Sequence, residues 1–124
     1  MATHSSDSQP RFAHDRLDAY RVAREALALG EAIARELPRG YGTLADQLRR
    51  ALLSAFLNVA EAASRSGADR LARFRCARGE ASEAAAALDA VEMLGLAPAG
   101  RVAPVVALLG RLYAMLTRLA RAGR

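Results

Sequence analysis

The chain divides into four stretches in which apolar residues recur every three or four positions, separated by short breaks that contain Gly or Pro. This spacing places the apolar side chains of each stretch on one face of an α-helix. Because the breaks are short, consecutive helices should lie side by side and run in opposite directions. The pattern therefore predicts an all-α, antiparallel up-down-up-down four-helix bundle. We expect a disordered tail over residues 1–14 and a single domain over 15–122, with helices at about 15–37, 43–65, 69–96 and 103–121.

Local signals support these helix boundaries. Pro38 and Gly40 should end the first helix, and Thr43 is a suitable N-cap for the second. Asp69 is a plausible N-cap for the third helix. Pro104 should lie in the first turn of the fourth, where the missing N–H costs little.

The composition favours closely packed helices. Hydrophobic residues make up 52% of the chain, aromatic residues only 5%, and Trp is absent, so small and aliphatic side chains must form the core. No run of about 18 apolar residues lacks a charge, and we expect no membrane span. The first ten residues lack the apolar segment of a signal peptide.

A single cysteine, Cys76, excludes an intramolecular disulfide and fits a reducing cytoplasm. We expect Cys76 to be a semi-buried, unreactive thiol. The two histidines, His4 and His14, both lie near the N-terminus, and neither belongs to a Glu-x-x-His pair of the di-iron type. The sequence also lacks a Gly-rich phosphate loop. We therefore expect neither an enzyme nor a bound cofactor or metal.

The net charge of +5 is unevenly distributed, and every basic residue that contributes to it is Arg. Residues 1–92 hold 13 acidic and 13 Arg side chains, whereas residues 93–124 hold five Arg and no acid. Two explanations stay open: the arginines contact nucleic-acid phosphates, or they offset the dipole at the C-terminus of a helix. We expect no aromatic residue to interleave with these arginines, and therefore backbone contacts rather than base stacking or sequence readout. The candidate contacts are Arg111, Arg118, Arg121 and Arg124.

A single line of polar residues crosses the otherwise apolar second helix, within an arc of roughly 80°. It consists of Gln47, Arg50, Ser54, Asn58, Glu61 and Arg65. On a buried helix these groups need partners. We favour a structural network, in which Glu61 pairs with Arg65 and Arg50 meets a carboxylate such as Glu83. A ligand or nucleic-acid site and, less favoured, a catalytic site are the alternatives.

The second helix also carries more apolar side chains than one bundle core can bury. Leu53, Phe56 and Leu57 lie beyond its main apolar face. Such a surplus predicts a subunit interface, and a wide core stripe is the alternative.

Several short blocks resemble the small "four helix bundle" family, which includes proteins encoded within intervening sequences of bacterial 23S ribosomal RNA genes. The resemblance covers roughly residues 17–119. It rests on Leu37-Pro38, Tyr41-Gly42, Gln47-Leu48-Arg49-Arg50-Ala51, Ser54, Asn58-Val59-Ala60-Glu61, Arg65, Arg73-Phe74, Ala77-Arg78-Gly79 and Glu83. Ala62 replaces a usual Gly, and Glu80 replaces a common Ser.

This resemblance implies a bundle that assembles into a ring, often a homopentamer, with no established enzymatic activity. A related branch acts as an accessory protein of diversity-generating retroelements and binds nucleic acid and reverse transcriptase. Two hypotheses follow for this chain. It is either a non-enzymatic, nucleic-acid-associated oligomer of the intervening-sequence type, or a structural scaffold or adaptor for a protein partner.

Overall fold

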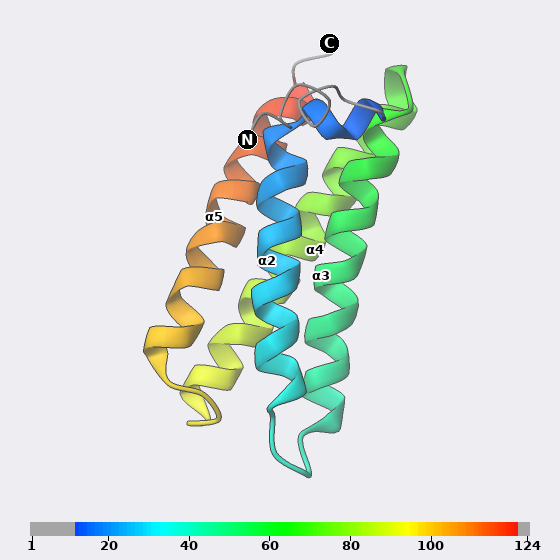
Figure 1. Ribbon diagram of the computed structural model, residues 1–124. Helices are drawn as coiled ribbons and strands as arrows, with labels where there is room; N and C mark the ends of the chain where they lie inside the picture. Colours follow the sequence, from blue (N-terminus) through cyan, green and yellow to red (C-terminus); the bar gives the residue numbers. More distant parts are fainter. Residues whose placement is uncertain (1–11, 122–124) are drawn as a thin grey trace, which may run out of the picture.

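The computed structural model describes residues 12–121 and shows four α-helices packed side by side (Figure 1). A short 3-10 helix, η1, precedes them, and the described residues contain no strand. The helices alternate in direction, and α5 closes the bundle by packing against both α4 and α2 (Figure 1). The predicted all-α four-helix fold is therefore confirmed. The elements are η1 (Ala13–Arg16), α2 (Asp18–Arg35), α3 (Gly42–Ala63), α4 (Gly67–Met93) and α5 (Ala99–Arg121).

Residues 1–11, which make up most of the expected tail, lie outside the described part of the chain, whereas residues 13 and 14 belong to η1. The helix starts also differ from the prediction. Tyr41 is the N-cap of α3 and Ser66 that of α4, so Thr43 and Asp69 lie within the first turns. Asp69 still favours the start of α4, because a carboxylate there complements the partial positive charge of the helix N-terminus.

Helix α5 begins at Ala99, one turn earlier than predicted. The carbonyl of Pro98 accepts hydrogen bonds from the backbone N–H groups of Arg101 and Val102, at 2.9 and 3.2 Å. Pro104 therefore lies in the second turn of the helix. Only one intrahelical bond is lost there, since a proline lacks a single N–H. The preference of Pro for the first helical position placed the predicted start too late.

By length and composition alone, α5 is apolar enough to cross a membrane. A core helix of a bundle meets the same test. In this structure α5 contributes a row of buried residues to the core, among them Val105, Leu109, Leu112 and Leu116.

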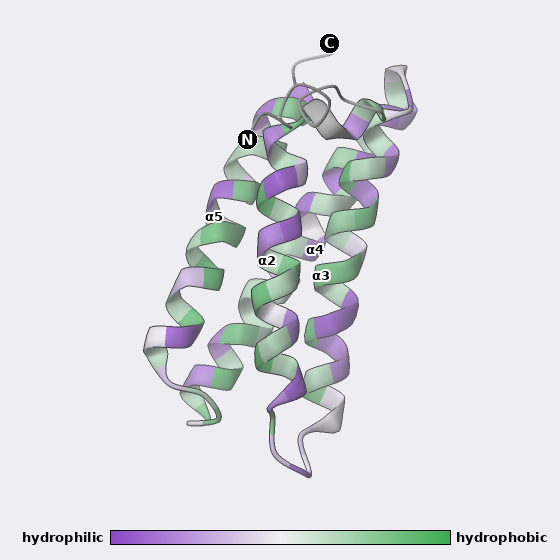
Figure 2. Ribbon diagram, viewed as in Figure 1, coloured by the Kyte–Doolittle hydropathy of each residue, from purple (hydrophilic) through white to green (hydrophobic). Residues whose placement is uncertain are grey.

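The core is built largely from small side chains. Within residues 12–121, 12 of the 26 buried hydrophobic residues are alanine, so the helices can approach one another closely. Gly30 of α2 marks one such contact, because a Cβ added there would collide with Leu52 of α3. No polar or charged residue in the described part of the chain is buried. Figure 2 shows hydrophobic and hydrophilic residues interspersed along the helices, as expected when each helix buries only one face.

Candidate functional site

The polar line on α3 lies at the surface of the bundle. Gln47, Arg50 and Arg65 are exposed, and Ser54, Asn58 and Glu61 are half-buried. The expectation that this line is buried is therefore wrong. The physical reason is that α3 buries its Ala and Leu face, whereas the polar line follows the edge of α3 beside α4, where solvent reaches both helices.

Asn58 is satisfied within its own helix. Its Nδ2 donates to the backbone carbonyl of Ser54 at 2.9 Å and to Ser54 Oγ at 3.2 Å. These local bonds offset the poor helix propensity of Asn. Asn58 therefore needs no partner on another helix to be tolerated in α3.

The predicted pair between Glu61 and Arg65 is confirmed, and it belongs to a longer ladder of ion pairs. Arg65 Nε lies 3.0 Å from Glu61 Oε2, and its Nη1 lies 2.8 Å from Asp69 Oδ2. Arg73 Nε approaches the other oxygen of Asp69 at 3.9 Å. The hydrogen bonds that Arg65 donates to Glu61 and Asp69 raise the pKa of Arg65. The ladder thus crosses the connection from α3 to α4 and leaves its charges mutually compensated.

Arg50 does not reach Glu83 as proposed: neither side chain makes an ion pair within the described residues. The neighbouring Arg49 instead bonds Glu31 on α2 with its Nε, at 3.0 Å. This bond is the main reason that the pKa of Glu31 is lowered. The sequence carried a signal for this pair, because positions 31 and 49 are equally distant from Gly40 in the loop of the α2–α3 hairpin.

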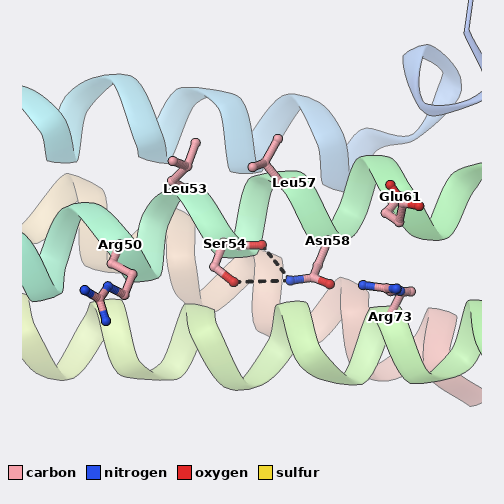
Figure 3. A pocket seen from close by; sticks show the side chains of 7 residues that line it. All are labelled: Arg50, Leu53, Ser54, Leu57, Asn58, Glu61 and Arg73. Carbon is pink, nitrogen blue, oxygen red and sulfur yellow. Dashed lines mark hydrogen bonds between the residues drawn. The ribbon is translucent and has the colours of Figure 1, made fainter.

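A shallow groove of about 340 Å³ runs along the polar line. Figure 3 shows Ser54 and Asn58 facing α4, with Arg73 of α4 beside Asn58 and with Leu53 and Leu57 on the opposite side of the line. Sequence reasoning did not include Arg73 in a site. The groove lining, which contains no His or Cys, consists of Arg50, Leu53, Ser54, Leu57, Asn58, Glu61 and Arg73.

The three residues proposed for a subunit interface occupy two different environments. Leu53 and Leu57 are 47% and 53% exposed on the outer side of α3. Phe56 is half-buried, and its ring centroid lies 5.0 Å from that of Tyr20 on α2. Leu53 and Leu57 are therefore free to contact a partner, whereas Phe56 already helps to join α2 and α3.

The arginines of α5 differ from those of α3 in their surroundings. Arg111, Arg118 and Arg121 are exposed and make no ion pair within the described residues. Arg124 lies outside these residues. Arg101, at the other end of α5, pairs with Glu36 of α2. The outer face of α5 therefore presents uncompensated positive charge.

One exposed aromatic side chain lies on α5, on the side that faces α4 rather than among these arginines. Tyr113 of α5 is 45% exposed, and the Cζ atom of Arg78 on α4 lies 5.7 Å from its ring centroid. Neither residue was predicted as part of a site. Tyr113 follows Arg111 by two residues, so the two side chains point to nearly opposite sides of α5.

The remaining candidates for reactive chemistry are scattered. Cys76 is exposed, not semi-buried as expected. His14 lies between the rings of Phe12 and Tyr20, with centroid distances of 5.4 and 4.4 Å. Within residues 12–121, no three His, Cys, Asp or Glu side chains come together in a way that could hold a metal ion.

No protein-family model matches the sequence, and neither does any curated protein, so the family resemblance rests on the residues quoted above.

Proposed function

We propose that this chain is a non-enzymatic, cytoplasmic four-helix-bundle protein of the 23S rRNA intervening-sequence type that binds nucleic acid through the arginines of α5. The observation that carries the proposal is the line of Arg111, Arg118 and Arg121, which are exposed and unpaired within the described residues. Since residues 93–124 contain no acid, nothing on the same helix competes with a phosphate for these arginines.

The spacing of these arginines fits the backbone of a nucleic acid. Arg111 and Arg118 are seven residues apart, so they lie on nearly the same side of α5, separated by about 10.5 Å along its axis. Phosphates on one strand of a duplex advance by about 3.4 Å along the axis, so the two guanidinium groups match phosphates about three nucleotides apart. Contacts of this kind give affinity without sequence readout.

We also propose that the chain acts as a homo-oligomer, in the form of the pentameric ring that the family resemblance implies. The exposed side chains of Leu53 and Leu57 support an interface on α3, because burying each would favour association by about 1.5–3 kcal/mol. A ring would repeat the arginine surface in each subunit, and linked sites bind far more tightly than single ones.

The alternative function is a scaffold or adaptor that binds a protein partner and no nucleic acid. The groove on α3 supports it, since exposed leucines beside polar groups are typical of protein interfaces. In that case the α5 arginines only complement the C-terminus of their helix.

Binding of nuclease-treated protein to structured RNA and duplex DNA, titrated with salt, separates these functions. We expect affinity to fall steeply with salt while light scattering shows an unchanged assembly mass. Arg111→Glu with Arg118→Glu should abolish most of the binding and leave the assembly intact. Arg24→Glu with Arg39→Glu is the matched control, because both side chains are exposed and unpaired within residues 12–121 and lie away from α5. Absence of binding at low salt from an intact oligomer would favour the scaffold.

A further inference from the structure

Arg78, Tyr113 and Thr117 form a bonded unit across the seam between α4 and α5. The Nη1 of Arg78 donates to Thr117 Oγ1 at 3.4 Å, and the Thr117 hydroxyl donates to the backbone carbonyl of Tyr113 at 2.9 Å. The guanidinium of Arg78 is thereby held over the Tyr113 ring, 5.7 Å from its centroid. Despite this cover, Tyr113 keeps 45% of its surface exposed. The unit is therefore ordered before any ligand arrives and still offers an open aromatic surface.

Positive charge lies next to this unit on both helices, toward the C-terminal end of α5. Since α4 and α5 are antiparallel and Arg78 meets Tyr113 and Thr117, Arg75 lies one turn further toward the C-terminal end of α5. On α5, Arg121 is exposed and lies one turn beyond Thr117 on nearly the same side of the helix. Arg75 is exposed and makes no ion pair within the described residues. A chain of phosphates that passes along the seam would thus meet cations on each helix.

We infer that the Arg78–Tyr113 unit stacks an unpaired nucleobase while Arg75 and Arg121 hold neighbouring phosphates. The inference rests on the proposed function and adds a preference for single-stranded over duplex nucleic acid. Aromatic rings and guanidinium planes both stack on exposed bases, and stacking tolerates any base because each has a π-face. A base within a duplex is already stacked, so only an unpaired segment can use this surface.

Affinities for a single-stranded oligonucleotide and a duplex of the same length test this inference. Tyr113→Leu should weaken single-strand binding roughly five- to hundredfold and leave duplex binding unchanged. Tyr113→Phe, which keeps the ring, should bind like the original chain. Tyr41→Leu makes the same change at another exposed tyrosine, in the α2–α3 connection, and should have no effect on binding. Equal losses for single strands and duplexes in Tyr113→Leu would overturn the stacking role.

Tyrosine fluorescence supplies a readout that a purely structural role would not move. The chain has no Trp and three Tyr, so Tyr20→Phe with Tyr41→Phe leaves Tyr113 as the sole tyrosine. Oligothymidylate should quench its emission by stacking, whereas inorganic polyphosphate, which has charge but no bases, should not.

The two proposals fail in different ways. If duplexes and single strands bind alike and Tyr113 emission is unchanged, the stacking site is disproved and the arginine surface stands. If neither nucleic acid binds at low salt, the proposed function fails and the stacking site fails with it.

Discussion

The α3–α4 surface and the outer face of α5 use arginine in different ways. On the first, Arg65 and Arg73 engage Glu61 and Asp69 in a continuous ladder. On the second, Arg111 and Arg118 have no carboxylate partner among the described residues. Exposed ion pairs contribute little net stability, but they cancel charge that would otherwise attract a ligand. The comparison teaches that the number of arginines on a surface matters less than the number left uncompensated.

The two surfaces also differ in the size of their apolar side chains. Leu53 and Leu57 project from α3, whereas alanines at 107 and 114 lie near Arg111 and Arg118 on α5. Large apolar side chains are typical of protein contacts, and small ones leave a phosphate backbone room to approach. The α3 surface therefore suits another subunit, and the α5 face suits a polyanion.

The largest effect should come from Leu53→Glu combined with Leu57→Glu. This variant tests the role of the α3 surface in assembly and of the α5 face in nucleic-acid binding in one experiment. We expect assembly to weaken by at least about 100-fold, because two apolar contacts are lost and charges are placed at the interface. Nucleic-acid affinity should then fall by about 10²–10⁴, since the sites are no longer linked.

Light scattering and filter binding on the same samples measure both quantities. Leu29→Glu is the matched control, because Leu29 is 42% exposed on α2. An unchanged assembly mass in the double variant would exclude α3 as the interface.

The glycines extend the comparison to stability. Gly30→Ala should reduce the free energy of unfolding by about 1–3 kcal/mol, because its Cβ would displace the buried Leu52 side chain. On α5, Gly110 faces open space, so Gly110→Ala should stabilise by about 0.5–1 kcal/mol through improved helix propensity. Urea denaturation of the two variants checks both signs. Equal stability would show that α2 and α3 are less closely packed than the structure indicates.

A smaller effect should follow when the α3–α4 surface is made to resemble α5. Glu61→Gln with Asp69→Asn removes the acids of the ladder and frees Arg65 and Arg73. We expect nucleic-acid affinity to rise a few-fold and the salt slope to steepen by about one to two for each subunit engaged. The control is Glu25→Gln with Glu92→Gln, which changes the net charge by the same amount. Salt titrations of both double variants separate the effect of charge at the ladder from the effect of net charge on nucleic-acid affinity.

The smallest effect concerns the pair between Glu31 and Arg49. Because the hydrogen bond from Arg49 lowers the folded-state pKa of Glu31, its stabilisation is present above the unfolded value of about 4.3. It is lost as the pH falls through the lower folded-state pKa. Glu31→Gln should therefore lose less stability than the original chain as the pH falls from 6 to 3. The difference should be small, because solvent screens this pair. An identical pH dependence of the urea midpoint would contradict the assigned bond.

The fold was predictable from the sequence because apolar periodicity and short breaks constrain it strongly. The helix boundaries were less predictable. The preference of Pro for the first turn placed the start of α5 near Pro104, whereas the carbonyl of Pro98 accepts the first hydrogen bonds of this helix. The location of the polar line was mispredicted because mean apolarity of a helix does not say which side is buried. Arg49 and Arg78 were missed for a related reason, since their partners lie 18 and 39 residues away and the packing of the helices brings them together.

The alanine-rich core also shapes how this sequence can evolve. In a core of leucines, most tolerated substitutions shorten a side chain or exchange it for one of similar size. Here 12 of the 26 buried hydrophobic positions in the described part of the chain hold the smallest residue with a Cβ, so nearly every exchange there adds atoms that the packed helices cannot accommodate. Relatives should therefore keep Ala, Gly or Ser at these positions long after their surfaces have diverged. A search for distant homologues would do better with the spacing of small residues than with overall identity.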